Sequence, residues 1–246
     1  MTDLDIAQSV TPRPILEIGS QLGIRAEELT LYGRDKAKIS PQILDLLDAA
    51  PRGRYVLVTA INPTPLGEGK TTTSIGLAMG LTRLGRRAAL TLRQPSLGPV
   101  FGVKGGGTGG GHAQVVPMED INLHLTGDAH AVAASHNLLS AFLDNHLFHG
   151  NSLSIDPTRT PWPRTLSVND RALRDVLLGQ ETGGRRGQFV ITEASEVMAV
   201  LALAKDCKDL HERLGRIVVG FTTSGTPVRA EALGCVGSMA VLLKDA

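Results

Sequence analysis

The chain contains 246 residues, and 25 lysines and arginines against 24 aspartates and glutamates leave a formal net charge of +1. Hydrophobic residues make up 42% of the chain and charged residues 20%, which is typical of an ordinary globular protein. The near-neutral charge argues against a nucleic-acid-binding protein, which usually has a basic surface. No signal peptide and no apolar stretch of about 20 residues is visible. We therefore expect a cytoplasmic protein without nucleic-acid or membrane partners, in which Cys207 and Cys235 are reduced thiols.

The first 53 residues are predicted to form a helical segment packed on the core. One helix is expected to begin near Ile15 and to end at Gly23. A second begins with Ser40 as N-cap and Pro41 as first helical residue, because proline lacks the amide hydrogen that would be unpaired there. Residues 51–53 end this helix, and residue 54 is the expected start of the main domain, 54–246.

A β-α-β unit follows. Residues 55–61 form a continuous apolar, β-branched run, typical of a strand buried on both faces of a parallel sheet. Residues 70–84 have helical spacing, with Gly85 just beyond the helix end. Residues 87–93 are the next predicted strand, and the crossover between the two strands should be right-handed.

The remaining elements alternate in the same way. Apolar spacing predicts a further strand over 216–222 and helices over 127–146, 170–178, 195–204 and 229–243. Alternating strands and helices predict an α/β fold with a doubly wound, mostly parallel sheet and helices on both faces. Residues 98–111 are rich in glycine, and we interpret them as an ordered loop close to a ligand, because glycine permits close backbone approach.

The strongest chemical signal is a P-loop between the first strand and its helix. Its predicted ATP-binding residues are Thr64, Pro65, Leu66, Gly67, Glu68, Gly69, Lys70 and Thr71. Glycines let successive amides converge on phosphate oxygens, and the helix N-terminus adds partial positive charge. Lys70 is expected to reach the terminal phosphates and the Thr71 hydroxyl to ligate Mg²⁺. Thr64 departs from the common pattern, which has glycine at the first position.

The strand after the P-loop helix ends in a cation. The run 69–85 looks like the branch of partition ATPases and nitrogenase iron proteins, whose next strand usually ends in an aspartate. Here that place is taken by Arg93. A guanidinium binds carboxylate or phosphate in a bidentate way, so Arg93 is predicted to hold a second anion beside the γ-phosphate, with a structural ion pair as the alternative.

Several longer segments resemble one family. The stretches 62–73, 92–99, 104–111, 117–128, 169–174, 213–220 and 239–246 are similar to formate–tetrahydrofolate ligase. His112 stands where many relatives have tyrosine. The family's chains are considerably longer, so this sequence resembles their N-terminal portion, and the resemblance places the aromatic residues that enclose the pterin in the remainder.

The resemblance implies a reaction and its ligands. Formate, ATP and tetrahydrofolate give 10-formyltetrahydrofolate, ADP and phosphate through formyl phosphate, as a step of one-carbon metabolism. Lys70 and Arg93 would be catalytic, Lys70 at the transferring phosphoryl group and Arg93 at formate and formyl phosphate. Segment 98–111 is hypothesised to cover the site. A monovalent cation and a homotetramer are also implied by the family.

Other polar residues allow several interpretations. Asp120 and Asp128 are candidates for the magnesium side of the site, and a structural ion pair is equally expected for each. His124 and His130 are candidates for shaping the site, whereas a metal site among the histidines is not favoured. Two functions compete with the ligase: a partition-type P-loop ATPase, and a nucleotide-binding but catalytically incomplete fragment.

Overall fold

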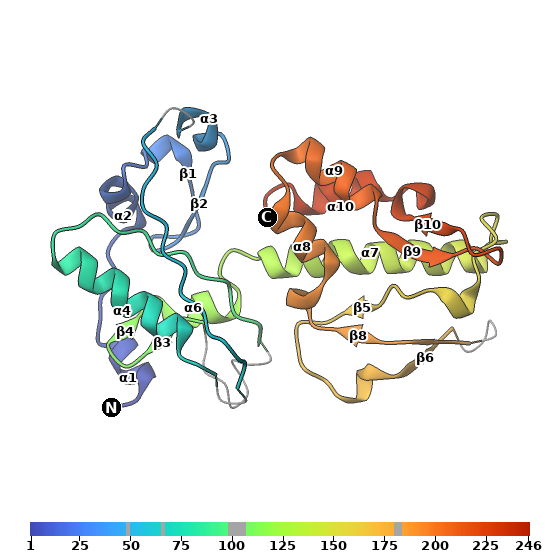
Figure 1. The fold of residues 1–246 in the computed structure, drawn as a ribbon, viewed down its shortest axis with the longest axis horizontal. Helices are drawn as coiled ribbons and strands as arrows, with labels where there is room; N and C mark the ends of the chain where they lie inside the picture. The colour runs from blue at the N-terminus through green and yellow to red at the C-terminus, as the bar shows by residue number, and fades with distance from the viewer. Residues whose placement is uncertain (48–49, 65–66, 98–106, 180–183) are drawn as a thin grey trace. The chain divides into compact units, whose positions relative to one another are not determined.

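The computed structural model describes residues 1–47, 50–64, 67–97, 107–179 and 184–246. The chain divides into two compact units, Met1–Thr126 and Gly127–Ala246, called unit 1 and unit 2 below (Figure 1). In the described part of the chain, no helix is both long and apolar enough to cross a membrane.

Unit 1 contains short helices and two hairpins. Its elements are α1 (Asp3–Gln8), α2 (Ile15–Leu22), η1 (Ala26–Glu28), β1 (Leu29–Leu31), β2 (Ala37–Ile39), α3 (Ile43–Leu47), α4 (Lys70–Arg83), β3 (Gly109–Gly110), β4 (Ala113–Gln114) and α6 (Met118–Leu123).

Unit 2 is built along one long helix. Its elements are α7 (Asp128–Phe148), η2 (Pro157–Arg159), β5 (Arg164–Thr165), η3 (Ala172–Arg174), β6 (Val176–Leu178), β7 (Arg185–Gly187), β8 (Phe189–Val190), η5 (Thr192–Ala194), α8 (Glu196–Leu203), α9 (Cys207–Gly215), β9 (Val218–Phe221), β10 (Pro227–Arg229), η6 (Ala230–Leu233) and α10 (Val236–Leu243).

Helices α2 and α4 begin and end close to the predicted residues, whereas the helix predicted from Pro41 begins at Ile43, and α1 and α6 were not predicted. Helix α2 ends at Gly23, which has a left-handed backbone with φ 84°. Helix α4 begins at Lys70, directly after the left-handed Gly69, and Gly85 follows its last turn with φ 74°. Glycine adopts these conformations without the steric penalty of a Cβ. The sequence therefore predicted the helix that follows the phosphate loop almost to the residue.

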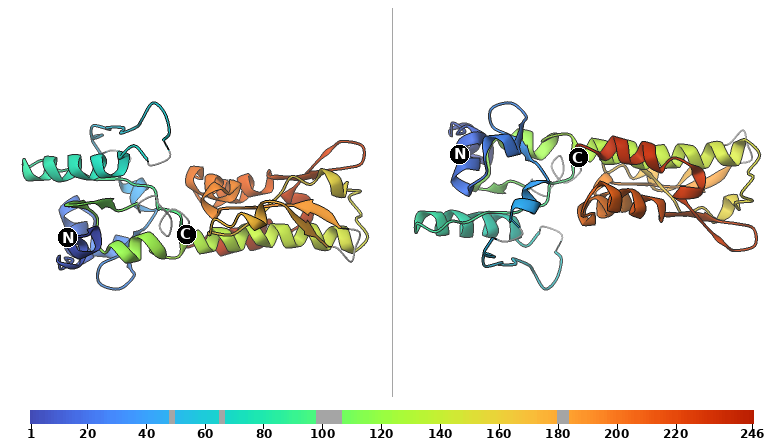
Figure 2. Two further views of the ribbon diagram at one scale, coloured as in Figure 1. Left: turned by 90° about the horizontal axis from the view of Figure 1, so that it is seen from below. Right: turned by 90° about the horizontal axis from the view of Figure 1, so that it is seen from above.

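The two strands predicted on either side of α4 are wrong for this structure. Residues 55–61 and 87–93 are coil and are mostly exposed. Figure 2 draws both segments as coil, one leading into α4 and the other leading away from it. A strand exists only through hydrogen bonds to a neighbour, and a parallel strand also needs both of its faces covered. Apolar composition alone cannot supply either of these.

All sheets among the described residues have two strands. The pairs β1–β2, β3–β4, β6–β7 and β9–β10 are antiparallel, and β5–β8 is parallel. The chain is thus a mixed α/β protein, but these small sheets are not the doubly wound parallel sheet expected from the alternation of elements. The β1–β2 hairpin, with Leu29 opposite Ile39, lies where only helices were predicted, because its three-residue strands are too short to show a clear period.

Unit 2 has a continuous hydrophobic core around α7. Helix α7 packs against α10, α8 and β5, and Figure 1 draws it through the length of the unit. The fully buried side chains include Val132, Leu139, Leu143, Ile155, Val197, Leu214, Val219 and Met239. Burying such a side chain contributes roughly 1.5–3 kcal/mol relative to its exposure. Helix 127–146 was thus correctly predicted, and it organises the unit.

Other predictions for unit 2 had mixed outcomes. Helix α8 begins where Ser195 accepts a hydrogen bond from the Val197 amide at 3.1 Å, and β9 lies inside the predicted strand 216–222. The predicted helix 229–243 is divided into η6 and α10, because Gly234 turns left-handed with φ 71°. The predicted helix 170–178 is wrong. It contains η3 and then β6, whose three residues pair with β7, so a tertiary contact overrides local spacing.

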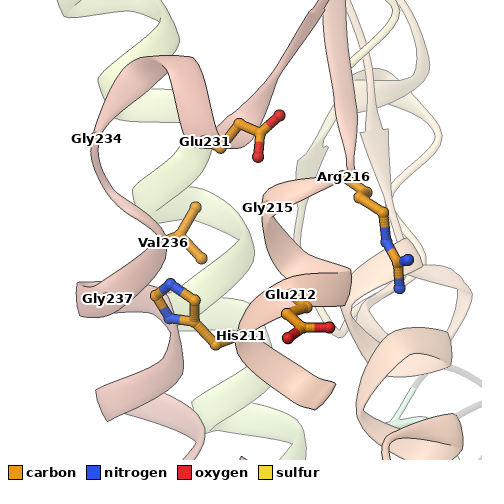
Figure 3. Close-up of a pocket in the computed structure, with 8 residues that line it drawn as sticks. All are labelled: His211, Glu212, Gly215, Arg216, Glu231, Gly234, Val236 and Gly237. Carbon is orange, nitrogen blue, oxygen red and sulfur yellow. The ribbon is translucent and has the colours of Figure 1, made fainter. Parts of the chain in front are cut away.

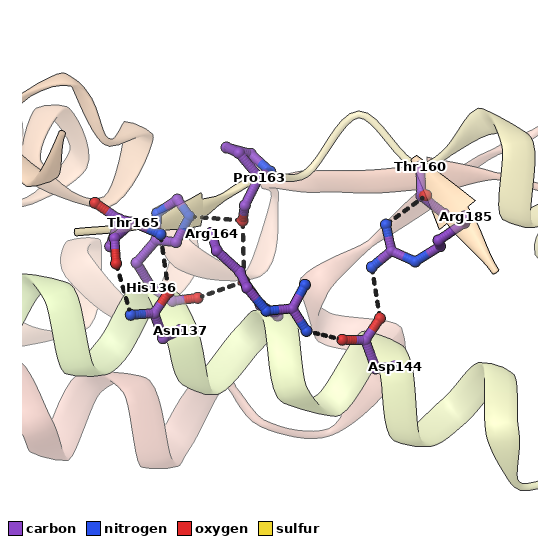
Figure 4. A network of polar contacts seen from close by, with 9 residues as sticks. His136, Asn137, Asp144, Thr160, Pro163, Arg164, Thr165 and Arg185 are labelled. Carbon is purple, nitrogen blue, oxygen red and sulfur yellow. Dashed lines mark hydrogen bonds and ion pairs between the residues drawn. The ribbon is translucent and has the colours of Figure 1, made fainter. Parts of the chain in front are cut away.

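Polar side chains of α7 contact β5, β7 and the segment before β5 in unit 2 (Figure 4). His136 stacks on Trp162 with ring centres 4.2 Å apart and donates from Nε2 to the Pro163 carbonyl at 2.9 Å. Asn137 exchanges two hydrogen bonds with the backbone of Thr165, at 2.9 and 3.0 Å. Asp144 binds two guanidinium groups, those of Arg164 and Arg185. These contacts hold β5 and β7 in place.

Candidate functional site

Two glycines of the predicted phosphate loop have left-handed backbone conformations. Gly67 and Gly69 have φ values of 89° and 71°, a region that favours glycine. The Gly67 amide donates to the Thr64 carbonyl at 3.2 Å, and the Thr64 hydroxyl donates to the Gly67 carbonyl at 3.1 Å. Gly69 directly precedes the N-terminus of α4, where amides without intrahelical partners and the helix dipole favour an anion. Predicted residues 65 and 66 lie outside the described residues.

A carboxylate inside the loop binds the groups expected to hold phosphate. Glu68 accepts a hydrogen bond from the Thr64 amide and forms an ion pair with the Lys70 ammonium. The hydrogen bonds from Lys70 and Thr64 lower the pKa of the Glu68 carboxyl to about 2, because they stabilise its charged form. Sequence analysis included Glu68 in the loop but did not foresee this pairing. The signal was an acidic residue two positions before Lys70.

Helix α4 is held by the glycine-rich hairpin. Ile75 is the buried side chain of α4, and the helix packs against β3 and β4. A Cβ added at Gly109 would lie 2.1 Å from the Ala113 carbonyl oxygen and 2.6 Å from the Ile75 side chain. Gly109 also has φ 86°. Glycine is therefore required where this hairpin approaches the helix that follows the phosphate loop.

A buried asparagine connects the same hairpin to α6. Asn122 accepts from the Gly107 amide at 3.0 Å and donates to the Thr108 hydroxyl at 3.1 Å. Pro95 lies so close to Gly107 that a Cβ there would be 2.8 Å from the proline ring. Residues 107–111 of the predicted loop 98–111 are thus packed on Pro95, α4 and α6, and its interpretation as an ordered loop close to a ligand stays a prediction. Residues 98–106 lie outside the described residues, and Asn122 was not singled out from the sequence.

The remaining site residues lie in different surroundings. Thr71 is half-buried in the first turn of α4, and Lys70 is exposed there. Arg93 is exposed at the end of the coil 87–93, just before Pro95 and the buried Ser96. All of these residues belong to unit 1. That Arg93 and Lys70 share one cleft stays a prediction.

Of the polar candidates after the glycine-rich loop, one makes a structural ion pair, and the roles of the others stay predictions. Asp120 forms an ion pair with Lys36, which is the structural alternative expected for it. Asp128 is the first residue of α7, and His124 follows the last residue of α6. Leu125, beside His124, has φ 50°, an unusual backbone for leucine of the kind that clusters at functional sites. Within the described ranges, no group of three or more His, Cys, Asp or Glu side chains could hold a metal ion.

A groove in unit 2 is a weaker candidate. It measures about 530 Å³ and lies between α9, η6 and α10 (Figure 3). His211, Glu212, Glu231 and Arg216 line it, and all four are exposed. Exposed side chains of both charges at the edge of a shallow groove are typical of a solvated surface. The phosphate loop of unit 1 therefore remains the candidate site.

Comparison with known proteins agrees with the motifs. The sequence model of the family described as formate–tetrahydrofolate ligase matches residues 1–246. Relatives with that description are 57% identical over 250 residues in Roseiflexus sp. (strain RS-1), 57% over 249 residues in Rhizobium rhizogenes (strain K84) and 55% over 249 residues in Cereibacter sphaeroides (strain KD131). Each match covers 100% of this chain but only 44–45% of the relative. The chain thus spans less than half the length of these relatives, and it belongs to the formate–tetrahydrofolate ligase family.

Proposed function

We propose that this chain carries the phosphoryl-transfer part of an ATP-dependent ligase that joins formate to tetrahydrofolate. The observation that carries the proposal is the phosphate loop: two left-handed glycines lead into a helix that begins with Lys70. Family membership supports the choice of substrates. The partition-type ATPase is disfavoured, because the family match covers all 246 residues.

The chemistry explains why two anions must be held together. Hydroxide is a poor leaving group, so formate does not acylate an amine directly. A formate oxygen attacks the γ-phosphorus of ATP, the bond to the bridging oxygen breaks, and ADP leaves. The product is formyl phosphate. The tetrahydrofolate amine then attacks its carbonyl carbon, the carbon–oxygen bond to phosphate breaks, and the amine proton is lost. Positioning and charge stabilisation supply most of the catalysis in phosphoryl transfer.

Lys70 and Arg93 supply the positive charge in this proposal. Lys70 stands at the helix N-terminus, so an incoming phosphate competes with Glu68 for its ammonium group. Arg93 binds formate and then formyl phosphate through its planar guanidinium. That segment 98–111 covers the site and excludes water, which would hydrolyse formyl phosphate, stays a hypothesis, because residues 98–106 lie outside the described residues. The contacts of Gly107 with Asn122 of α6 and the packing of β3 on α4 are compatible with it.

The residues of the loop fit a magnesium ion that arrives with ATP. Thr71 offers a hydroxyl oxygen, the type of ligand that Mg²⁺ prefers. Among the described residues this hydroxyl makes no hydrogen bond. Bound Mg²⁺ would neutralise charge on the phosphate oxygens. A monovalent cation, a homotetramer and the binding of tetrahydrofolate outside this chain are further proposals that rest on the family alone.

The finer architecture is also a proposal. A doubly wound, mostly parallel sheet of the P-loop type would include residues 55–61 and 87–93 as strands, with a helical segment 1–53 packed on a domain 54–246. The uninterrupted apolar character of 55–61 supports it. The second candidate function, a nucleotide-binding but catalytically incomplete fragment, is favoured by one observation: the chain spans 44% of its Roseiflexus relative.

An ADP-release assay separates these two functions. It is performed with ATP and Mg²⁺, with and without formate and tetrahydrofolate, on this chain and on a chain extended to the length of the Roseiflexus relative. The ligase predicts formate-dependent ADP release that tetrahydrofolate increases in the extended chain. If only the extended chain shows formate-dependent ADP release, this chain is a catalytically incomplete fragment. ADP release that does not depend on formate in either chain would contradict the proposed ligase function.

A further inference from the structure

The hairpin β3–β4 supports the helix that follows the phosphate loop. Among the described elements, α4 packs most extensively against β3 and β4. The backbone of Gly109 closely approaches the buried Ile75 side chain of α4. Beside this contact, a Cβ added at Gly76 would lie 4.0 Å from the Cβ of Ala113. The position of α4, and of Lys70 in its first turn, therefore depends on the hairpin.

This hairpin is too small to be stable by itself. Its strands have two residues each, and an isolated two-stranded hairpin is marginally stable at best. Glycine occupies positions 109–111, and glycine loses more conformational freedom on ordering than any other residue. The hairpin is therefore expected to need contacts from other elements.

Helix α1 supplies such contacts at the turn of the hairpin. Oδ1 of Asp3 accepts a hydrogen bond from the Gly111 amide at 2.8 Å, and the Gln114 side chain donates to the Asp3 carbonyl at 2.9 Å. A carboxylate acceptor makes the first of these bonds stronger than a bond between neutral groups. Figures 1 and 2 draw the hairpin between α1 and α4. Asp3 thus holds a turn that lies 108 residues further along the chain.

Helix α6 holds the other end of the hairpin. The buried Asn122 side chain bonds the Gly107 amide and the Thr108 hydroxyl, and Thr108 is itself buried. The Gln8 side chain of α1 donates to Glu119 of α6 at 3.1 Å, so the two supports are also joined to each other. The hairpin is thus fixed at both ends, and α4 packs on it.

We propose that Asp3 is a positioning residue of the phosphate site, because it holds the hairpin that supports Lys70 and Thr71 in the first turn of α4. The proposal rests on the proposed function in that these two residues bind the phosphates of a nucleotide. Misplacing a functional group by about 1 Å can cost about 10²-fold in rate, so the support of a helix contributes to the site that the helix carries. By its charge alone, a carboxylate in unit 1 opposes the binding of an anion. Through the hairpin, Asp3 favours it.

Calorimetric titration of the 246-residue chain with ATP and Mg²⁺ separates these two effects. Asp3→Ala removes both the charge and the acceptor, whereas Asp3→Asn removes the charge and keeps an oxygen that can accept from the Gly111 amide. The affinity for ATP should fall about three- to tenfold in Asp3→Ala and stay within about twofold of the wild type in Asp3→Asn. Glu17→Ala is the matched control, since it removes another exposed carboxylate of unit 1, and it should not lower the affinity. Wild-type affinity of Asp3→Ala, or an equal loss in Asp3→Asn or in the control, overturns the proposal.

Amide hydrogen exchange without nucleotide tests the support of α4 directly. Asp3→Ala should speed exchange in residues 109–114 and 74–80 by about three- to tenfold, because losing one hydrogen bond makes local opening easier, with α7 as internal reference. Unchanged exchange in 74–80 overturns the proposal, whatever the affinity for ATP. If the wild-type chain bound no ATP, the nucleotide site of the proposed function would be refuted, and the exchange experiment alone would decide whether Asp3 positions α4.

Discussion

Unit 1 and unit 2 differ in how they bury their apolar residues. Unit 2 encloses a continuous core around α7, whereas the described part of unit 1 buries only Ala7 and Ile75 among its apolar residues. Yet the candidate phosphate site lies entirely in unit 1. Hydrophobic burial is the main source of folding free energy. The comparison shows that stability and the candidate chemistry reside in different parts of this chain.

Substitution of one buried leucine should give the largest effect on stability. Leu143 is fully buried on α7, so Leu143→Ala should lower the free energy of unfolding by about 2–5 kcal/mol. Leu57→Ala, at an exposed position of unit 1, should change it by less than about 0.5 kcal/mol. Urea unfolding monitored by circular dichroism measures both. Equal losses would show that unit 1 is as well packed as unit 2.

Substituting either of the two proposed catalytic cations should lower activity without changing stability. In a chain of the relatives' length, Lys70→Ala and Arg93→Ala should each lower formate-dependent ADP release by about 10²–10³, the usual cost of losing one strong electrostatic partner of a transition state. Both residues are exposed, so the unfolding midpoint should not change. The matched control is Arg83→Ala, which removes an exposed cation at the far end of α4. Wild-type turnover by either variant would refute its proposed role.

Acid should weaken unit 2 through one buried histidine. Burial lowers the pKa of His136 below its ordinary 6.5. Above that value the ring is neutral in both states. Below it the unfolded chain gains a proton that the folded chain resists, so the free energy of unfolding should fall as pH falls, by at most about 1.4 kcal/mol per pH unit. Urea titrations between about pH 7.5 and 5 measure the slope, and His136→Asn should reduce it. An unchanged slope in the variant would assign the effect to other groups.

The smallest expected effect concerns nucleotide binding by unit 1. Glu68 binds the Lys70 ammonium and the Thr64 amide, so phosphate must compete with a carboxylate. Glu68→Gln removes the charge and keeps the shape, and it should raise ATP affinity severalfold. Because the pKa of Glu68 is about 2, the carboxylate stays charged down to that pH, and its competition should not vary around neutral pH. Titration calorimetry with Glu119→Gln as an exposed control measures the difference. Weaker binding by Glu68→Gln would mean that Glu68 helps to hold the nucleotide.

Local sequence signals predicted part of this structure well. Gly69, Gly85 and Ser195 mark helix ends through backbone conformation and capping, which depend on only a few neighbouring residues. The P-loop residues and their place before a helix were predicted for the same reason. The Glu68–Lys70 pair and the Asn122 contacts were not, because they depend on side-chain positions that spacing does not specify.

By itself, the sequence determined the family, helices α2, α4, α7 and α8, and the apolar character of residues 55–61, and it predicted the phosphate loop. The tertiary structure decided whether apolar runs became strands. Residues 218–221 form β9 because β10 pairs with them, whereas residues 55–61 are coil because nothing in the described chain pairs with them. A helix closes its hydrogen bonds within one segment, but a strand requires a partner from elsewhere.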